Sequence, residues 1–103
     1  MDLKDEIIND INKNRIMLYM KGTKDQPMCG FSATIVKILN YYDVDFEATN
    51  VLENPNIRIE LSKHSNWPTI PQLFVEGELI GGCDIALEMH QQGQLESVLL
   101  KKN

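Results

Sequence analysis

The sequence contains little cysteine and no long apolar run, and each shortage excludes a class of protein. Its 103 residues include two cysteines, too few for a disulfide framework to hold a domain of this size. No apolar run approaches the length of a membrane span, and the first residues, Met1-Asp2-Leu3-Lys4, contain no apolar core of a signal peptide. We therefore expect a cytoplasmic protein without membrane contact, in a compartment that keeps thiols reduced.

Basic residues are also in short supply. Ten Lys and Arg residues stand against fifteen Asp and Glu residues, which gives a formal net charge of −5. A nucleic-acid partner needs a concentrated basic surface, so this balance argues against one. The length is typical of one domain, and an apolar content of 43% is ordinary for a globular protein. We expect residues 1–103 to form a single domain without repeats or linkers.

The spacing of apolar residues predicts an alternation of helices and strands. Helical spacing, or start and stop signals, predict five helices. The first two are expected over 2–13 and 30–42, and the last two from Ile85 to Gly93 and over 95–99. The third starts at Asn54-Pro55, with Ile57, Leu61 and His64 on one face. The basic residues Lys101 and Lys102 suit the negative end of the last helix. Strands are expected from the apolar run at 16–20, the alternation at 44–49, and a hairpin of 73–75 and 79–80.

The predicted order of elements determines the fold class. Early strand–helix–strand units favour parallel pairing, and the late hairpin adds antiparallel strands. The expected product is an α/β fold with a mixed four-stranded sheet flanked by helices on both faces, the thioredoxin-like arrangement. Ligands of such open sheets gather beyond the carboxyl ends of strands. The segment Lys21–Ser32, which follows the strand at 16–20, lies at such an end.

Cys29 lies where this segment meets the helix at 30–42. A thiol in the first turn of a helix faces unpaired backbone N–H groups and the positive end of the helix dipole, which lower its pKa. Redox proteins with a Cys-x-x-Cys pair place a second thiol three residues later, but Ser32 stands there, so any second sulfur must come from outside this loop. The alternative is a buried core cysteine, which the polar, turn-rich segment before it does not favour.

Three motifs stand in order along the chain: Lys21-Gly22 through Pro27-x-Cys29-Gly30-Phe31-Ser32, then Trp67-Pro68-Thr69-x-Pro71-Gln72-Leu73, then Gly81-Gly82-x-Asp84-Ile85. Together they resemble the CGFS-type monothiol glutaredoxins, over nearly the whole chain and at the expected spacing. The resemblance implies a glutaredoxin fold and a glutathione site with Cys29 as the catalytic thiol. Lys21 and Arg58 resemble the family's cations for the glycyl carboxylate, and Arg suits a carboxylate through two parallel hydrogen bonds.

The other two motifs resemble further parts of the glutathione site. Thr69-Ile70-Pro71 resembles the segment in which family members hold the proline in cis, so that the backbone of Ile70 would pair with the cysteinyl unit as an added strand. Gly82-Cys83-Asp84 opens a helix whose free N–H groups suit the γ-glutamyl carboxylate. Asp84 then suits the ammonium, or is an ordinary N-cap, or both. Cys83 is expected to contribute its backbone rather than a metal-binding thiol.

The remaining candidates have simpler interpretations. Trp67 is expected at the rim of the site, with a partly structural role. His64 and His90 are expected at the surface rather than as ligands. Met17, Met20 and Met89 are expected in the core.

The monothiol motif also bears on iron–sulfur chemistry. A [2Fe–2S] cluster usually takes four cysteine ligands. Cys29 and the thiol of a bound glutathione supply two, so two subunits with two glutathiones supply four. With the family resemblance, this count implies a cluster that bridges a homodimer, or a mixed dimer with a BolA-type partner, and that passes to apo iron–sulfur proteins.

Two other functions are open on the same residues. One is a glutathione-dependent oxidoreductase, in which the Cys29 thiolate takes the glutathionyl group from a mixed disulfide and a second glutathione releases it. This one-thiol cycle does not need a cysteine in place of Ser32. The other is a thioredoxin-like interaction domain without chemistry, which the alignment of Lys21, Cys29 and Asp84 with a glutathione site disfavours.

Overall fold

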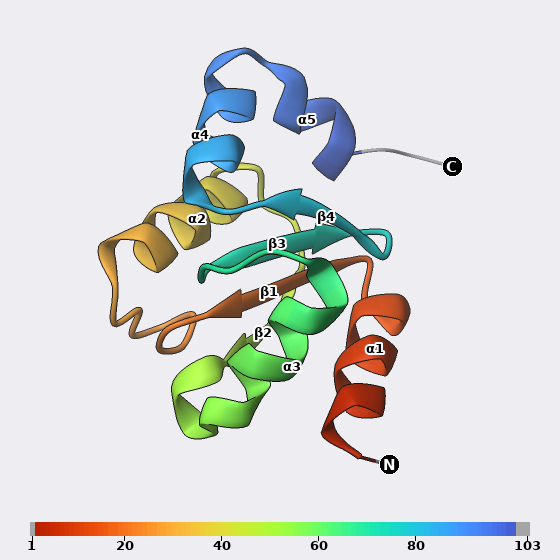
Figure 1. Cartoon of the computed structure of the whole chain (residues 1–103). Helices are drawn as coiled ribbons and strands as arrows, with labels where there is room; N and C mark the ends of the chain where they lie inside the picture. The colour runs from red at the N-terminus through yellow and green to blue at the C-terminus, as the bar shows by residue number, and fades with distance from the viewer. Residues whose placement is uncertain (1, 101–103) are drawn as a thin grey trace.

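The computed structural model describes residues 2–100, and every predicted helix and strand is present in it (Figure 1). The elements, in chain order, are α1 (Leu3–Lys13), β1 (Ile16–Met20), α2 (Gly30–Tyr41), β2 (Glu47–Asn50), the 3-10 turn η1 (Val51–Glu53), α3 (Pro55–Ser65), β3 (Gln72–Val75), β4 (Glu78–Gly81), α4 (Cys83–Gln91) and α5 (Gln94–Leu99). The prediction that Lys101 and Lys102 complement the end of the last helix falls outside the described residues.

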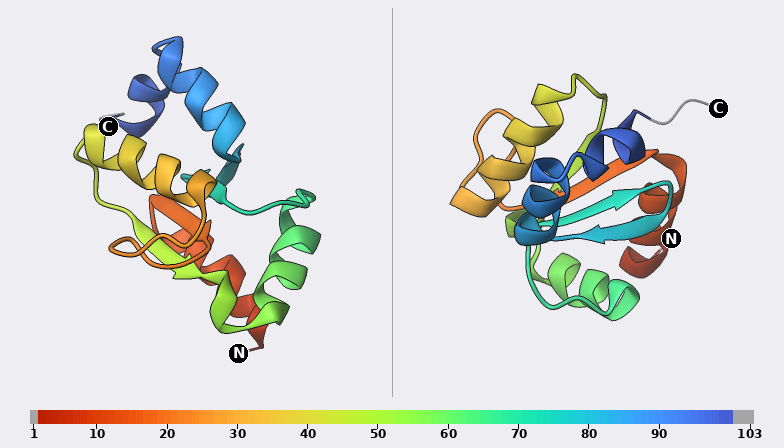
Figure 2. Two further views of the ribbon diagram at one scale, coloured as in Figure 1. Left: turned by 90° about the vertical axis from the view of Figure 1, so that its left-hand side faces the viewer. Right: turned by 90° about the horizontal axis from the view of Figure 1, so that it is seen from above.

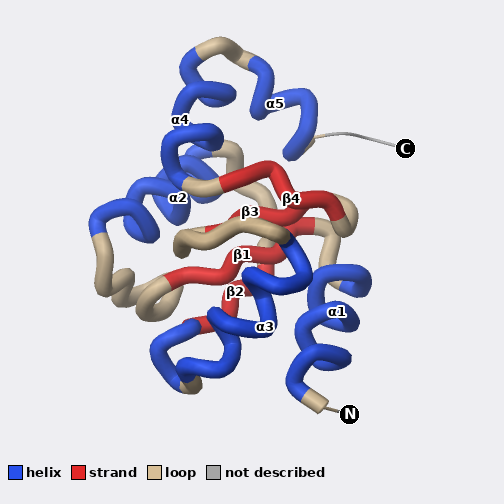
Figure 3. The backbone as a smooth tube through the Cα atoms, viewed as in Figure 1, coloured by secondary structure: helices blue, strands red, loops and turns tan. Residues whose placement is uncertain are grey.

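The four strands form one mixed sheet in the order β2-β1-β3-β4. Strands β1 and β2 are parallel, and β3 is antiparallel to both β1 and β4. Helices α1 and α3 pack on one face of the sheet, while α2, α4 and α5 pack on the other (Figure 3). The predicted fold class, a thioredoxin-like mixed sheet between two helical layers, is confirmed.

Strand β1 runs through the centre of the molecule, which explains its unbroken apolar sequence. Every residue of β1 is buried. Ile16, Leu18 and Met20 face the helices α2, α4 and α5, whereas Met17 and Tyr19 face α1 and α3. Because successive side chains of a strand point to opposite faces, a central strand covered on both sides must be apolar at every position.

Polar side chains form hydrogen bonds with the backbone at the ends of three helices. The side chain of Asp2 accepts a hydrogen bond of 2.9 Å from the backbone N–H of Asp5 at the start of α1. Asn54 caps α3 in the same way, and Pro55 follows it as the first helical residue. The carbonyl groups of Leu99 and Val98, at the end of α5, accept hydrogen bonds of 2.7 and 3.0 Å from the side chain of Arg15. This guanidinium therefore fastens the last turn of α5 to the start of β1.

One detail of the predicted pattern is wrong. The alternation at 44–49 predicted a strand, but β2 covers only Glu47–Asn50. Val44 and Phe46 lie in the connection before it and still pack against the core, so their apolar character reflects packing without strand pairing. His64 is exposed, as expected, because it lies in the last turn of α3 beyond the final buried residue of that helix.

In the part of the chain that the structure describes, residues 2–100, no helix has the length and apolar character required to cross a membrane.

Candidate functional site

The segment between β1 and α2 folds back on itself as a narrow hairpin, which we call the thiol loop (residues 21–28). The backbone N–H of Met28 donates a hydrogen bond of 2.9 Å to the carbonyl group of Lys21, and Thr23 and Gln26 exchange two backbone bonds of 3.1 Å. Gly22 has φ +91°, and a Cβ there would lie 2.4 Å from the Gln26 carbonyl oxygen, so only glycine fits. The thiol loop extends outward beside β2 and returns to the start of α2 (Figure 2).

Cys29 follows the thiol loop directly and is the N-cap residue of α2, one position before the predicted first turn. The backbone N–H of Ser32 is the largest influence that lowers the pKa of the Cys29 thiol. The N–H of Phe31, the Ser32 hydroxyl and the Lys21 charge lower this pKa further, whereas desolvation opposes them. A Cβ added at Gly30 would meet nothing within 4 Å, so one flank of this region is open. Cys29 is therefore an activated, half-buried thiol.

Ser32 stands where a second thiol would complete a Cys-x-x-Cys pair. Its side chain is 0% exposed, and its hydroxyl oxygen accepts a hydrogen bond of 3.1 Å from the backbone N–H of Lys21. Ser32 therefore joins the base of the thiol loop to α2, in addition to its effect on the Cys29 sulfur.

The second cysteine, Cys83, has the opposite electrostatic environment. Desolvation is the main cause that raises the pKa of the Cys83 thiol, and the charges of Asp84 and Cys29 raise it further. A hydrogen bond with Thr34 acts in the other direction. Both cysteines are free thiols, so the site contains one thiol with a lowered pKa and one with a raised pKa.

One cleft of about 420 Å³ brings the sequence-predicted residues together. It is lined by all eight predicted site residues, namely Lys21, Cys29, Arg58, Thr69, Ile70, Gly82, Cys83 and Asp84. These residues come from the end of β1, the starts of α2 and α4, the first half of α3, and the connection that precedes β3. The residues are thus spread over more than sixty positions of sequence, and the fold gathers them at one place. Their roles toward a ligand stay predictions.

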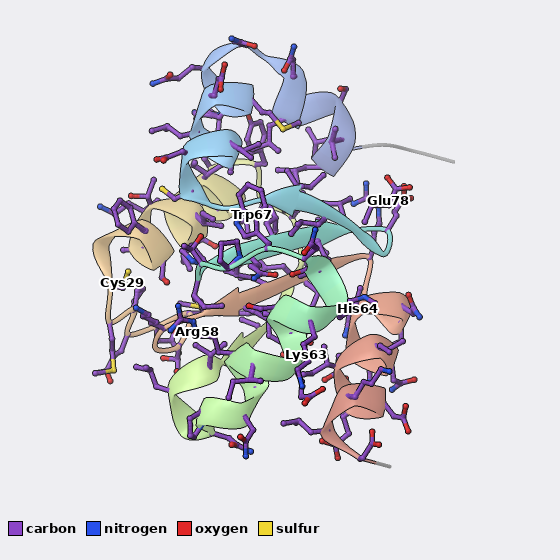
Figure 4. All side chains as sticks on the ribbon, in the orientation of Figure 1. Cys29, Arg58, Lys63, His64, Trp67 and Glu78 are labelled. Atoms are coloured by element: carbon purple, nitrogen blue, oxygen red, sulfur yellow. The ribbon has the colours of Figure 1, made fainter. Side chains whose placement is uncertain are left out.

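Two cations, Lys21 and Arg58, lie along the cleft. Lys21 is half-buried, while Arg58 is exposed and donates a hydrogen bond of 3.2 Å from Nη2 to the carbonyl group of Pro68. Figure 4 shows Arg58 on the part of α3 nearest Cys29, whereas Lys63 and His64 lie at the far end of this helix. The arrangement gives one wall of the cleft a positive charge that suits a carboxylate.

The segment 67–71 forms another wall of the cleft, and the side chain of Gln72 holds it in place. The buried Gln72 side chain donates from Nε2 to the carbonyl groups of Trp67, at 2.9 Å, and Thr69, at 3.1 Å. The Ile70–Pro71 peptide bond is cis, as the family resemblance predicts. Trp67 lines the cleft, in line with the expected position at the rim (Figure 4).

The start of α4 contributes backbone N–H groups to the cleft. Gly82 is the N-cap of α4, and no side-chain hydrogen bond caps this helix within residues 2–100. The interpretation of Asp84 as an N-cap is therefore wrong, because Asp84 lies inside the first turn. A Cβ added at Gly82 would lie 3.2 Å from the carbonyl oxygen of Pro71, so the close approach of the two walls favours glycine. The uncapped N–H groups form a place where an anion is stabilised.

An apolar rim next to the thiol was not predicted from the sequence. Met28 and Phe31, on either side of Cys29, are 70% and 61% exposed, and Phe31 also lines the cleft. Exposed apolar side chains that gather beside a functional group can mark an interaction surface. The sequence signal that could have identified them is their position in the motif that contains Cys29. Ile85, which is half-buried in the first turn of α4, also lines the cleft without having been predicted.

Metal ligands are scarce in this site. Among residues 2–100, no group of three or more His, Cys, Asp or Glu side chains is arranged to hold a metal ion. Any iron–sulfur cluster bound at Cys29 would therefore need sulfur ligands from outside the chain.

Comparison with known proteins places this architecture in a family. The glutaredoxin family model matches residues 16–80, which include the thiol loop, Cys29 and the segment 67–71. The chain belongs to the glutaredoxin family. A probable monothiol glutaredoxin 2 of Rickettsia felis is 54% identical over 93 residues, which cover 90% of this chain and 89% of the relative. Glutaredoxin 4 of Buchnera aphidicola is 50% identical and covers 98% of this chain and 94% of the relative. Within its family the chain is therefore a monothiol glutaredoxin.

Solved glutaredoxins share the fold. The solution structure of reduced poplar apo GrxS14 is 44% identical, has a TM-score of 0.85, and covers 96% of this glutaredoxin and 91% of the poplar chain. A buckwheat glutaredoxin solved as a complex with glutathione is 22% identical, has a TM-score of 0.85, and covers 96% and 88% of the two chains. The second likeness concerns the fold alone.

Proposed function

We propose that this monothiol glutaredoxin binds glutathione in the 420 Å³ cleft and, as a dimer, carries a [2Fe–2S] cluster to apo iron–sulfur proteins. The observation that supports the proposal is the convergence of an activated thiol, two cations and an uncapped helix start on one cleft. Each of these features matches one chemical group of the tripeptide. Reduced thiols are required, so we propose a reducing cytoplasm as the place of action.

Glutathione carries two carboxylates, an ammonium and a thiol, and the cleft offers a partner for each. Lys21 and Arg58 would bind the glycyl carboxylate, Arg58 with two parallel N–H donors. The N–H groups at the start of α4 would receive the γ-glutamyl carboxylate, and Asp84 would bind the ammonium. The backbone of Thr69 and Ile70 would align the middle of the peptide. The glutathione sulfur would then lie next to that of Cys29.

The cluster is the cargo of this site, and its ligand count agrees with the residues present. One subunit supplies Cys29 and one glutathione thiol, so two subunits supply the four sulfur ligands that a [2Fe–2S] cluster usually takes. Cys83 is left out of this set, and its raised pKa makes the thiolate that iron would bind less accessible than at Cys29, whose pKa is lowered. Since half of the ligands are small molecules, the cluster would be exchangeable, as a carrier requires.

A second copy of the chain would cover the apolar rim of Met28 and Phe31. Two Cys29 sulfurs that share one cluster bring the surfaces around both cysteines into contact. Met28 and Phe31 are the large apolar side chains exposed at this place, and their burial would favour the dimer. A BolA-type partner in a mixed dimer, or an apo iron–sulfur protein, would meet the same surface.

A second function, glutathione-dependent oxidoreduction, is favoured by the lowered pKa of Cys29. The thiolate would attack the glutathione sulfur of a mixed disulfide and release the target protein as a thiolate. A second glutathione would then attack the new Cys29–glutathione disulfide, which restores the Cys29 thiolate and yields glutathione disulfide. Strong turnover in a glutathionyl-disulfide assay, without a chromophore after loading with iron and sulfide, would favour this function over the carrier.

The glutathione part of the proposal is tested by Arg58→Ala. Loss of the guanidinium removes a charged partner of the glycyl carboxylate, so the Kd for glutathione should rise by about tenfold. Isothermal titration of the reduced protein measures this change. The control is Lys63→Ala, which removes a cation from the far end of the same helix and from an exposed pair with Glu60. An equal effect of the two substitutions would mean that Arg58 contributes only net charge.

A further inference from the structure

Asn50, the last residue of β2, links the thiol loop to the strand beside it. Its side-chain oxygen accepts a hydrogen bond of 2.9 Å from the backbone N–H of Gly22 and one of 3.0 Å from that of Leu52. Met20 and Asn50 are direct neighbours at the carboxyl ends of the parallel strands β1 and β2. One carboxamide therefore connects the two segments that leave the sheet at this end.

The bond to Gly22 acts next to the cation of the cleft. The backbone of Lys21 is held by Ser32, which accepts from its N–H at 3.1 Å, and by Met28, which donates to its carbonyl group at 2.9 Å. Both of these partners lie on the Cys29 side of the loop. On the opposite side, the Asn50 side chain accepts the hydrogen bond from the N–H of Gly22, the residue after Lys21. The backbone at Lys21 and Gly22 is thus held from the α2 side by Ser32 and from the β2 side by Asn50, which fixes the direction in which Lys21 leaves the sheet.

A hollow behind the thiol loop explains why such an anchor is needed. Its volume is about 370 Å³, and it is lined by loop residues 22–25 and by β2. The acidic side chains of Asp25, Glu47 and Glu53 also line it and outnumber Lys24, the cation among the lining residues. Lys21 lines the glutathione cleft and Gly22 lines this hollow, so the chain passes between the two at this point. Without an anchor, the loop has room to shift, and the acidic lining would attract the Lys21 ammonium away from the cleft.

We propose that Asn50 is a positioning residue for glutathione, which keeps the Lys21 ammonium directed at the cleft by anchoring Gly22. The inference rests on the proposed glutathione site and adds to it a residue that does not line the cleft. A neutral carboxamide suits the task, because it accepts two hydrogen bonds without adding a fourth negative charge to the hollow. The same oxygen also caps η1, so a test must separate anchoring from capping.

Asn50→Ser separates the two roles. A serine hydroxyl is a good N-cap and can still accept from the N–H of Leu52, but it is too short to reach Gly22 as well. The Kd for glutathione, measured by isothermal titration of the reduced protein, should rise by about three- to tenfold in Asn50→Ser and in Asn50→Ala. Asp2→Ala removes a comparable helix cap on α1, remote from the cleft, and should leave the Kd unchanged.

A double-mutant cycle with Lys21→Ala shows whether Asn50 acts through the cation. Once the ammonium is absent, Asn50→Ser should cause little further loss of glutathione affinity. Glutathione with its glycyl carboxylate converted to an amide is a second probe, and wild type and Asn50→Ser should bind it about equally. A merely structural role of Asn50 would weaken the binding of both peptides and would add to the effect of Lys21→Ala.

The outcomes separate this inference from the proposed function. If wild-type protein binds glutathione and Asn50→Ser binds it equally well, the positioning role is wrong and the glutathione site stands. The inference is also wrong if Asn50→Ser and Lys21→Ala weaken binding additively, or if Asp2→Ala weakens it as much as Asn50→Ser. If wild-type protein does not bind glutathione, the proposed function itself fails.

Discussion

Cys29→Ser is expected to abolish the assembly of a cluster-bridged dimer and to leave the fold intact. The substitution removes one thiolate from each subunit, so two of the four cluster ligands are lost, and a serine hydroxyl is a poor replacement for a thiolate at iron. The fold should persist because Cys29 is an N-cap position of α2, where serine is favoured. Anaerobic loading with iron, sulfide and glutathione, followed by visible absorption and native mass measurement, tests the loss.

Cys83→Ser is the matched control for this experiment. It removes a thiol from the same cleft, and it should keep most of the cluster, because the Cys83 thiol favours the protonated form. Circular dichroism checks that both variants are folded. A coloured dimer in Cys29→Ser would refute the role assigned to Cys29, and complete loss in Cys83→Ser would identify Cys83 as a ligand.

The two cysteines should also differ in their reaction with iodoacetamide. At pH 7 Cys29 is expected to react at least several-fold faster than Cys83, since only the thiolate is a nucleophile. Because the pKa of Cys29 is lowered, its thiolate is retained at pH values below the ordinary thiol pKa and is lost only as the pH falls through the lowered value. The raised pKa of Cys83 has the opposite effect, so its rate should increase only above the ordinary value.

Mass spectrometry of the two cysteine peptides, after timed alkylation across a range of pH, measures both rates in one sample. Ser32→Ala is an informative comparison, because it removes the hydroxyl that lowers the pKa of Cys29 and leaves the stronger backbone N–H contribution in place. The reaction of Cys29 should then require a somewhat higher pH. Superimposable pH profiles for Cys29 and Cys83 in the wild-type protein would contradict the electrostatic account of the site.

Patterns that are local in sequence predicted most of this molecule. The apolar run of β1 indicated a strand, and Asn54-Pro55 marked the start of α3. These signals work because a helix cap acts on the residues next to it, and because an apolar run is visible in the sequence before the fold covers it. Seven of the eight site residues lie in the three motifs, Arg58 was predicted from the family resemblance outside them, and the fold brings all eight to one cleft.

The features that sequence reasoning missed depend on contacts between distant residues. Asn50 holds Gly22 across 28 positions, and nothing in the polar sequence around either residue indicates the pairing. Gln72 stands as a polar residue at the start of a buried strand, a signal of a structural role whose partners only the fold reveals. The start of β2 was placed too early, because Val44 and Phe46 pack against the core without pairing as part of the strand.

The most direct test of the carrier function is the dependence of cluster assembly on glutathione. The wild-type protein is loaded anaerobically with iron and sulfide, with glutathione present or omitted, and its visible spectrum and native mass are recorded. We expect an iron–sulfur chromophore and a dimer with one cluster and two glutathiones in the first sample, and a colourless protein in the second. A cluster-bearing dimer of the same stability that forms without the tripeptide would contradict the account.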